Sequence, residues 1–138
     1  MKKFAAHGSF HFSVEGRILI SRMNGPFNAE FARAYIHGQL PIIRELAKSG
    51  PWAGLTEFSE NALFPLEMSA IIRGQTIVGV QQLQLVANCW VVPPSVEGYG
   101  IVDKQALNIY HGVLPFQIFE NSADARAWLE SQLSRQHN

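Results

Sequence analysis

The sequence is short of charge. Charged residues make up 16% of the chain, against a usual content of about 25% in globular proteins. Eleven basic and eleven acidic side chains give a formal net charge of zero. A neutral chain lacks the electrostatic attraction by which basic proteins bind nucleic acid or anionic membranes. We therefore expect no nucleic-acid partner and no membrane partner.

Cysteine is also scarce. The only one, Cys89, excludes an intrachain disulfide framework and a thiolate-rich metal site, and it is compatible with a reducing compartment. The first eight residues contain no apolar run long enough for a signal sequence. No charge occurs between Arg73 and Glu97, but glutamines, Asn88 and Pro93-Pro94 interrupt the roughly 20 apolar residues that a membrane span needs. These features predict a cytoplasmic protein.

The chain is rich in apolar residues and has the length of a single domain. Hydrophobic residues at 47% exclude intrinsic disorder, and 138 residues without a change of composition correspond to one domain, 1–138. A chain of this size buries roughly two thirds of its unfolded surface. We therefore expect a compact core.

Hydrophobic periodicity predicts nine elements. Alternating residues over 10–14 and an extended run over 17–23 indicate two strands joined by a turn at Glu15-Gly16. Asn28 is placed to cap the first helix, and Pro41 is expected to bend it. The helices are expected at 29–48, 65–82, 101–111 and from 122 onward, and the later strands at 52–58, 85–92 and 114–120.

The buried faces of two helices are predicted from the same spacing. The helix over 65–82 is expected to bury Leu66, Ala70, Ile77 and Val78, with Met68 and Ile71 beside them, and its glycines allow a break into two pieces. The last helix, capped by Asn121 or Ser122, is expected to bury Ala125, Trp128 and Leu129.

The alternation of helix and strand after the hairpin favours parallel pairing through right-handed crossovers. The strand over 85–92 is apolar on both faces, which is typical of a central strand covered on both sides. We expect an α/β fold with a single mixed, mostly parallel five-stranded sheet, an N-terminal antiparallel hairpin and four helices.

This element order, the opening hairpin over 12–20 and the closing segment over 116–129 resemble the STAS and anti-sigma-factor-antagonist-like domains. The resemblance is strongest to their small stand-alone bacterial relatives and covers nearly the whole chain. It implies a STAS-like fold and a non-catalytic role in partner binding or regulation.

In that family a phosphorylatable serine follows the strand before the second helix, and Ser59 is its nearest counterpart here. The family motif also has an aspartate and a glycine, which this segment lacks. Glu57 and Glu60 would repel an added phosphate. The residues themselves favour Ser59 as a loop or cap residue.

Other chemical signals are weak. Cys89 with His111 as its base would need an accessible, electropositive thiol, whereas Cys89 lies in an uncharged strand, so a buried core cysteine is favoured. His7 and His11 lack further ligands for a metal. Gly98-Tyr99-Gly100 lacks the lysine of a phosphate loop and is interpreted as a turn. We expect no catalytic residue, no metal and no cofactor.

Parallel strands deliver the loops that follow them to one edge of the sheet, where open α/β sheets hold ligands. This geometry predicts that Ser59, Glu60, Phe64 and Tyr99 lie at one end of the sheet and form the binding surface. The occupant is either a protein partner or a small apolar ligand. An enzyme is the third alternative, for which the loops after the strands offer only Glu57, Glu60, Glu97 and Asp103.

Apolar residues in the loops favour a homodimer. They are Phe64, Leu66, Val96, Tyr99 and Ile101, which a monomer would leave in water. A specific dimer interface buries about 800 Å² on each subunit. The alternative is that these side chains fold back onto their own sheet or line a ligand pocket.

Overall fold

A computed structural model describes residues 8–137. His7 and the rest of the segment 1–7, on which the expectations about a signal sequence and a two-histidine metal site depend, lie outside the described residues. The strands are β1 (Ser9–Glu15), β2 (Ile18–Asn24), β3 (Trp52–Ser59), β4 (Leu85–Val91) and β5 (Phe116–Phe119). The helices are α1 (Ala29–Ser49), α2 (Leu66–Gln82), α3 (Val102–Tyr110) and α4 (Ser122–Ser134), with 3-10 turns η1 (Tyr99–Ile101) and η2 (Arg135–His137).

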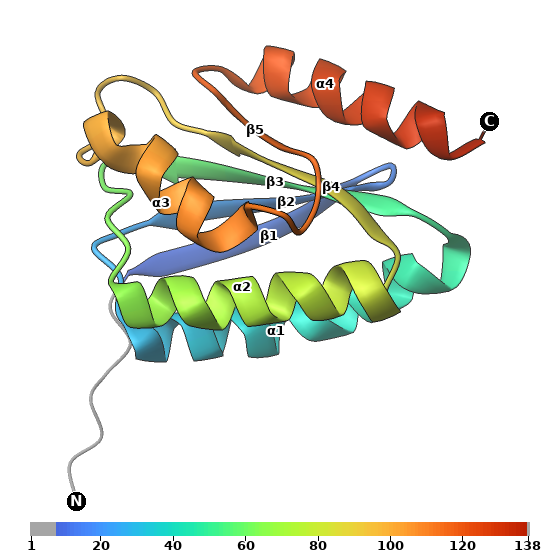
Figure 1. Cartoon of the computed structure of the whole chain (residues 1–138), viewed down its shortest axis with the longest axis horizontal. Helices are drawn as coiled ribbons and strands as arrows, with labels where there is room; N and C mark the ends of the chain where they lie inside the picture. Colours follow the sequence, from blue (N-terminus) through green and yellow to red (C-terminus); the bar gives the residue numbers. More distant parts are fainter. Residues whose placement is uncertain (1–7, 138) are drawn as a thin grey trace, which may run out of the picture.

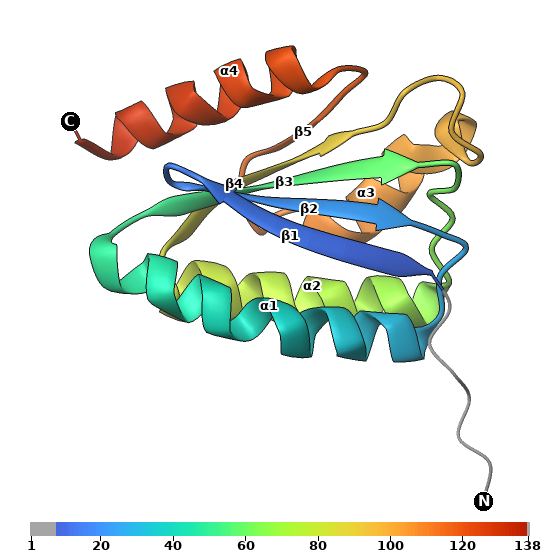
Figure 2. The ribbon, with the colours of Figure 1, turned by 180° about the vertical axis from the view of Figure 1, so that it is seen from behind.

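The five strands form one sheet in the order β1-β2-β3-β4-β5. β1 and β2 are antiparallel, and the other three pairings are parallel. Helices α1 and α2 lie side by side under one face of the sheet, and α4 lies over the other (Figures 1 and 2). The predicted fold class and element order are confirmed. None of the helices among residues 8–137 has the length and apolar content needed to cross a membrane.

The helix caps follow the local sequence. The Asn28 side-chain oxygen accepts a hydrogen bond from the Phe31 N–H at 2.9 Å, and the Asn121 oxygen accepts one from the Asp124 N–H at 2.9 Å. Both asparagines satisfy backbone donors that the first turn of a helix leaves free. Pro41 lies inside α1 without ending it, and α2 is one continuous helix.

The two faces of the sheet have separate cores. On the α4 side, Ala125, Leu129 and Leu133 pack against buried strand residues, among them Cys89. Trp128 is only half-buried. On the other side, aromatic rings fill the space between the sheet and the helices α1, α2 and α3. They include Phe27, Phe31, Phe58, Trp90 and Tyr110. β4 is therefore covered on both faces, as its sequence predicts.

The predicted buried face of α2 is wrong. Leu66 is 78% exposed and Val78 is 37% exposed, and Ala70 is also exposed. The helix instead buries a row that mixes apolar, small and polar residues: Met68, Ser69, Ile72, Thr76 and Gly79. Hydrophobic spacing selects the wrong face here because polar side chains occupy positions directed at the sheet.

Candidate functional site

The loops after β3 and β4 lie together at the edge formed by the carboxyl ends of the parallel strands. The Glu97 N–H donates to the Glu60 carbonyl oxygen at 2.8 Å, and the Ala62 N–H donates to the Glu97 carbonyl oxygen at 2.9 Å. Asn61 and Glu97 also form an isolated parallel bridge. The structure therefore brings the loop of Ser59 and Glu60 beside the loop that leads to Tyr99, as parallel pairing predicts.

Phe64, expected at this surface, and Val96, expected among the apolar loop residues of a dimer, turn inward. Phe64 is half-buried, and its ring lies 5.3 Å from Phe27 and 5.3 Å from Trp90 between centroids. The Phe64 N–H donates to Gln105 Oε1 at 2.8 Å. Val96 is only 5% exposed. For these two side chains the alternative to the dimer holds, because both fold back onto the core of their own chain.

The same edge is acidic. The carboxylates of Glu60, Glu97 and Glu120 accept hydrogen bonds from Asn24, Asn61 and Tyr99, respectively, at 3.0, 3.2 and 2.9 Å. None of these three carboxylates forms an ion pair with another described residue. Their partners are neutral donors, so the negative charge at this edge is not cancelled. The hydrogen bond to Glu120 raises the pKa of Tyr99.

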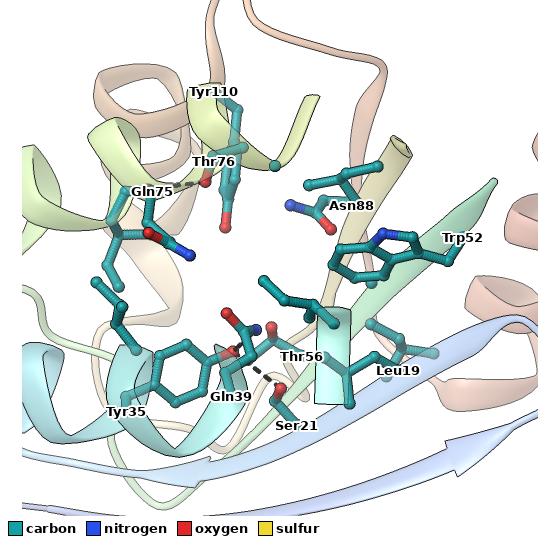
Figure 3. A pocket seen from close by; sticks show the side chains of 17 residues that line it. Leu19, Ser21, Tyr35, Gln39, Trp52, Thr56, Gln75, Thr76, Asn88 and Tyr110 are labelled. Carbon is teal, nitrogen blue, oxygen red and sulfur yellow. Dashed lines mark hydrogen bonds between the residues drawn. The ribbon is translucent and has the colours of Figure 1, made fainter. Parts of the chain in front are cut away.

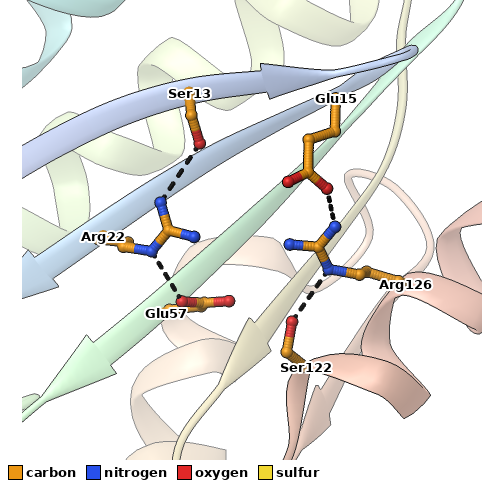
Figure 4. A network of polar contacts seen from close by, with 6 residues as sticks. All are labelled: Ser13, Glu15, Arg22, Glu57, Ser122 and Arg126. Carbon is orange, nitrogen blue, oxygen red and sulfur yellow. Dashed lines mark hydrogen bonds and ion pairs between the residues drawn. The ribbon is translucent and has the colours of Figure 1, made fainter.

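A polar network covers part of the sheet face on the α4 side. The Arg22 Nε donates to Glu57 at 3.2 Å and its Nη1 donates to Ser13 at 3.3 Å, while Arg126 of α4 bonds to Glu15 and Ser122 (Figure 4). Helix α4 packs mainly on β3, β4 and β5. The network residues of β1 and β2, which are Ser13, Glu15 and Arg22, therefore lie beyond the main contacts of α4 with the sheet. Exposed pairs of this kind contribute about 0–1 kcal/mol each. We interpret the network as a solvated face.

Exposed apolar side chains occur on η1 and α3 and at the first residue of α2. Leu66, Tyr99, Ile101 and Leu107 are 78%, 37%, 49% and 60% exposed, and they are four of the six exposed large hydrophobic residues in the described chain. Gln105 of α3 joins that helix to the loop before α2, since its Nε2 donates to the Ala62 carbonyl oxygen at 2.8 Å. We call these four residues the η1–α3 surface.

A groove lies between α3 and the edge strand β5. It has a volume of about 550 Å³, and its apolar lining comes mainly from Leu107, Tyr110, Leu114, Phe116 and Ile118. Ligand pockets in proteins typically have volumes of about 300–1,000 Å³. The groove is lined by α3 and by residues before and within β5, so Ser59, Glu60 and Tyr99 are not part of its wall.

A smaller internal cavity lies between the sheet and the helices α1 and α2. Its volume is about 50 Å³, and Figure 3 shows polar side chains from the strands and from three helices around it. The polar residues of the lining are Ser21, Tyr35, Gln39, Thr56, Gln75, Thr76, Asn88 and Tyr110. Sequence reasoning missed this cavity. The available signal was polar residues within otherwise apolar strands, such as Ser21 after Ile18-Leu19-Ile20 and Asn88 in 85–92.

The structure separates Cys89 from His111. Cys89 is fully buried on the α4 side of the sheet, whereas His111 lines the groove between α3 and β5. Burial, with a smaller contribution from Glu57, raises the pKa of the Cys89 thiol to about 12. The thiol is therefore protonated at neutral pH and is no nucleophile. Among residues 8–137, no three His, Cys, Asp or Glu side chains form a group that could hold a metal ion.

Comparison with known proteins does not assign the chain to a family. No protein-family model matches it, and no curated protein matches it.

Proposed function

We propose that this chain is a non-catalytic, STAS-like domain that acts in regulation by binding protein, and that the η1–α3 surface is its contact. The observation that carries the proposal is the exposure of Leu66, Tyr99, Ile101 and Leu107 on α2, η1 and α3, because α3 contacts both of the other elements. Exposed apolar patches on soluble proteins commonly mark interaction sites, and aromatic residues are enriched at the centres of interfaces. The acidic edge formed by Glu60, Glu97 and Glu120 lies next to this surface.

The first partner in this proposal is a second copy of the chain. Asp103 and Lys104 are both exposed at the start of α3, within the η1–α3 region. In a two-fold interface each residue of one copy meets residues of the same patch on the other copy. Asp103 of one subunit can therefore pair with Lys104 of the other around an apolar centre. The low charge content of the whole chain favours the same arrangement.

Sedimentation equilibrium tests the dimer. We expect a species of twice the chain mass of 15.4 kDa for the unmodified protein. The double variant Ile101→Asp, Leu107→Asp is expected to be a monomer because it places charge at the centre of the interface. The matched control is Val14→Asp, which alters a side chain that is 46% exposed on the edge strand β1 and should remain dimeric. A single 15.4 kDa species of unmodified protein at all concentrations would contradict the proposal.

A second candidate function is the binding of a small apolar ligand, and the groove between α3 and β5 favours it. The volume of the groove suits a drug-sized molecule, and Leu114, Phe116 and Ile118 give it an apolar wall. Titration with a fluorescent naphthalene dye tests this function. Saturable fluorescence that Ile118→Glu abolishes and Val14→Glu preserves would support it. Equal fluorescence in both variants would place the dye elsewhere.

A further inference from the structure

We propose that the internal cavity between the sheet and helices α1 and α2 is a binding site for a small uncharged polar molecule. The cavity lies inside the domain, and Tyr99, Ile101 and Leu107 are not among its lining residues. The proposal is therefore independent of the protein-binding function proposed above. It rests on four features of the cavity: the placement of polar groups in its wall, the unused hydrogen-bond donors there, the absence of charged side chains from its lining, and its volume.

The central strands form a polar floor for the cavity. Ser21 of β2 pairs with Thr56 of β3, and Gly54 of β3 pairs with Asn88 of β4. A Cβ atom at Gly54 would collide with the Asn88 Oδ1, so a side chain at this position would displace the Asn88 amide. The missing side chain at Gly54 thus leaves room for the Asn88 amide, which points into the cavity (Figure 3).

Hydrogen-bond donors in the wall are unused. The Gln75 Nε2 atom is buried and has no hydrogen-bond partner among residues 8–137. The Tyr110 oxygen accepts from the Trp90 Nε1 at 3.2 Å, which leaves the Tyr110 hydroxyl hydrogen available to the cavity. Figure 3 shows the Gln75 amide and the Tyr110 hydroxyl directed at the empty space. Because an unpaired buried donor costs about 1–3 kcal/mol, a ligand or a water that accepts hydrogen bonds from these groups is stabilised in the cavity.

Other polar groups hold the wall in place. The Tyr35 hydroxyl bonds to the Ser21 Oγ at 2.8 Å and accepts from the Gln39 Nε2 at 3.0 Å. The Thr76 Oγ1 donates to the Ile72 carbonyl oxygen at 2.8 Å. These bonds fix the orientations of side chains from α1, α2 and β2 before any ligand enters. A wall fixed in this way lowers the entropy cost of binding.

The lining contains no Asp, Glu, Lys, Arg or His. Burial raises the pKa of Tyr35 to about 12 and raises that of Tyr110 as well, so both phenols are neutral at physiological pH. An ion in this cavity would be desolvated without a counter-charge, which is strongly unfavourable. The ligand is therefore uncharged. It must accept hydrogen bonds from Gln75 and Tyr110, and the amide oxygens in the wall suit a ligand that also donates.

The volume of about 50 Å³ limits the size of the ligand. This volume exceeds the roughly 10–15 Å³ that a single water needs, so the cavity admits a molecule of a few non-hydrogen atoms. Small carboxamides, ureas and short polyols have this size and carry both donors and acceptors. They define the chemical class that we propose.

Titration of the full chain with acetamide, followed by amide NMR spectroscopy, tests the site. We expect saturable shifts at the amides of Gly54, Gln75 and Asn88, with a dissociation constant on the order of millimolar for so small a ligand. Acetate has the same shape but carries charge, and it should cause no saturable shift at these residues. Gln75→Met removes the unused donor and should weaken acetamide binding by about threefold to tenfold.

The matched control is Gln82→Met, an exposed position on the same helix, which should bind acetamide like the unmodified protein. Asn88→Leu, which fills the cavity with an apolar side chain, should abolish binding while the dispersed spectrum of a folded protein is kept. The proposal is overturned if acetamide gives no saturable shift, if acetate binds as well, or if Gln75→Met binds as tightly as the unmodified protein. A cavity that holds only ordered water would give the first of these results.

Discussion

Arg17 donates hydrogen bonds to backbone carbonyl groups at the C-terminal end of α1, which is distant from Arg17 in the sequence. Its Nε donates to the Pro51 carbonyl oxygen at 2.9 Å, and its Nη2 donates to the carbonyl oxygens of Leu46 and Gly50. The last carbonyl groups of a helix have no partner within the helix and carry the negative end of its dipole. Arg17 therefore supplies both the missing donors and a positive charge at the end of α1.

The first prediction concerns this contact. Arg17→Met keeps most of the apolar stem but removes the three hydrogen bonds, and we expect it to lower the free energy of unfolding by about 2 kcal/mol. The control is Arg44→Met on α1, where the arginine is exposed and should change stability by less than about 0.5 kcal/mol. Urea unfolding followed by circular dichroism measures both. Equal effects of the two variants would show that the Arg17 contacts contribute nothing specific.

At the scale of the secondary-structure element, α2 shows that apolar residues need not mark the buried face. Met68 is fully buried, whereas Leu66, two positions earlier, is 78% exposed. Gly79 packs against Leu85, where an added Cβ would lie 3.1 Å from the Leu85 Cδ2. The helix approaches the sheet through small and polar residues because the cavity and its hydroxyl and amide groups lie beneath it.

The second prediction compares these two residues of α2. Met68→Ala should lower the free energy of unfolding by about 2–5 kcal/mol, the range for a fully buried large side chain. Leu66→Ala should change it by less than about 0.5 kcal/mol in a monomeric background such as Ile101→Asp, Leu107→Asp. Thermal or urea unfolding of the two variants in that background gives the comparison. A larger loss for Leu66→Ala would restore the buried face that hydrophobic spacing predicts.

The sequence is a good guide to the elements whose signals are local. The caps at Asn28 and Asn121, the hairpin turn at Gly16 and the doubly covered strand β4 depend on neighbouring residues, and the structure confirms them. Boundaries near β5 are less accurate, because the strand is only Phe116–Phe119 and is paired on one side alone. The meeting of the loops after β3 and β4 follows from parallel pairing.

The parts that the sequence does not predict depend on contacts between distant residues. Phe64 and Val96 read as exposed loop residues, but the aromatic rings of Phe27, Phe58 and Trp90 give Phe64 an apolar environment. The internal cavity likewise arises from strands and helices that are separated along the chain. No local pattern specifies that their polar side chains face one another.

At the scale of the whole molecule, the two faces of the sheet differ in chemistry. The layer under α4 is apolar, with Cys89 buried in it at 0% exposure. The layer between the sheet and the helices α1, α2 and α3 combines aromatic rings with buried hydroxyl and amide groups, among them those of Tyr35 and Tyr110. Both layers thus bury groups that ionise only at high pH, and this makes the stability of the whole domain depend on pH.

The last prediction is a loss of stability in alkali. The pKa of Tyr35 rises from 10.0 to about 12 on folding and that of Cys89 from 9.0 to about 12, while the pKa of Tyr110 rises further still, in each case chiefly through burial. Between pH 9 and 12 the unfolded chain therefore binds fewer protons than the folded chain. The free energy of unfolding should be at its full value below pH 9 and fall as the pH rises toward 12.

Urea unfolding at pH 7.5, 9, 10 and 11 measures this fall. Tyr110→Phe removes one of the three groups and should make the decline shallower, although the variant also loses the bond from Trp90. Tyr99→Phe is the comparison: Tyr99 is 37% exposed and lies outside both cores, and its pKa is raised chiefly by the hydrogen bond to Glu120 rather than by burial, so this variant should change the decline less than Tyr110→Phe. Absorbance at 295 nm gives an independent check: Tyr99 should ionise in the folded protein, whereas Tyr35 and Tyr110 should ionise only together with unfolding. A free energy of unfolding that is constant from pH 9 to 11 would mean that these three groups titrate alike in the folded and unfolded chains.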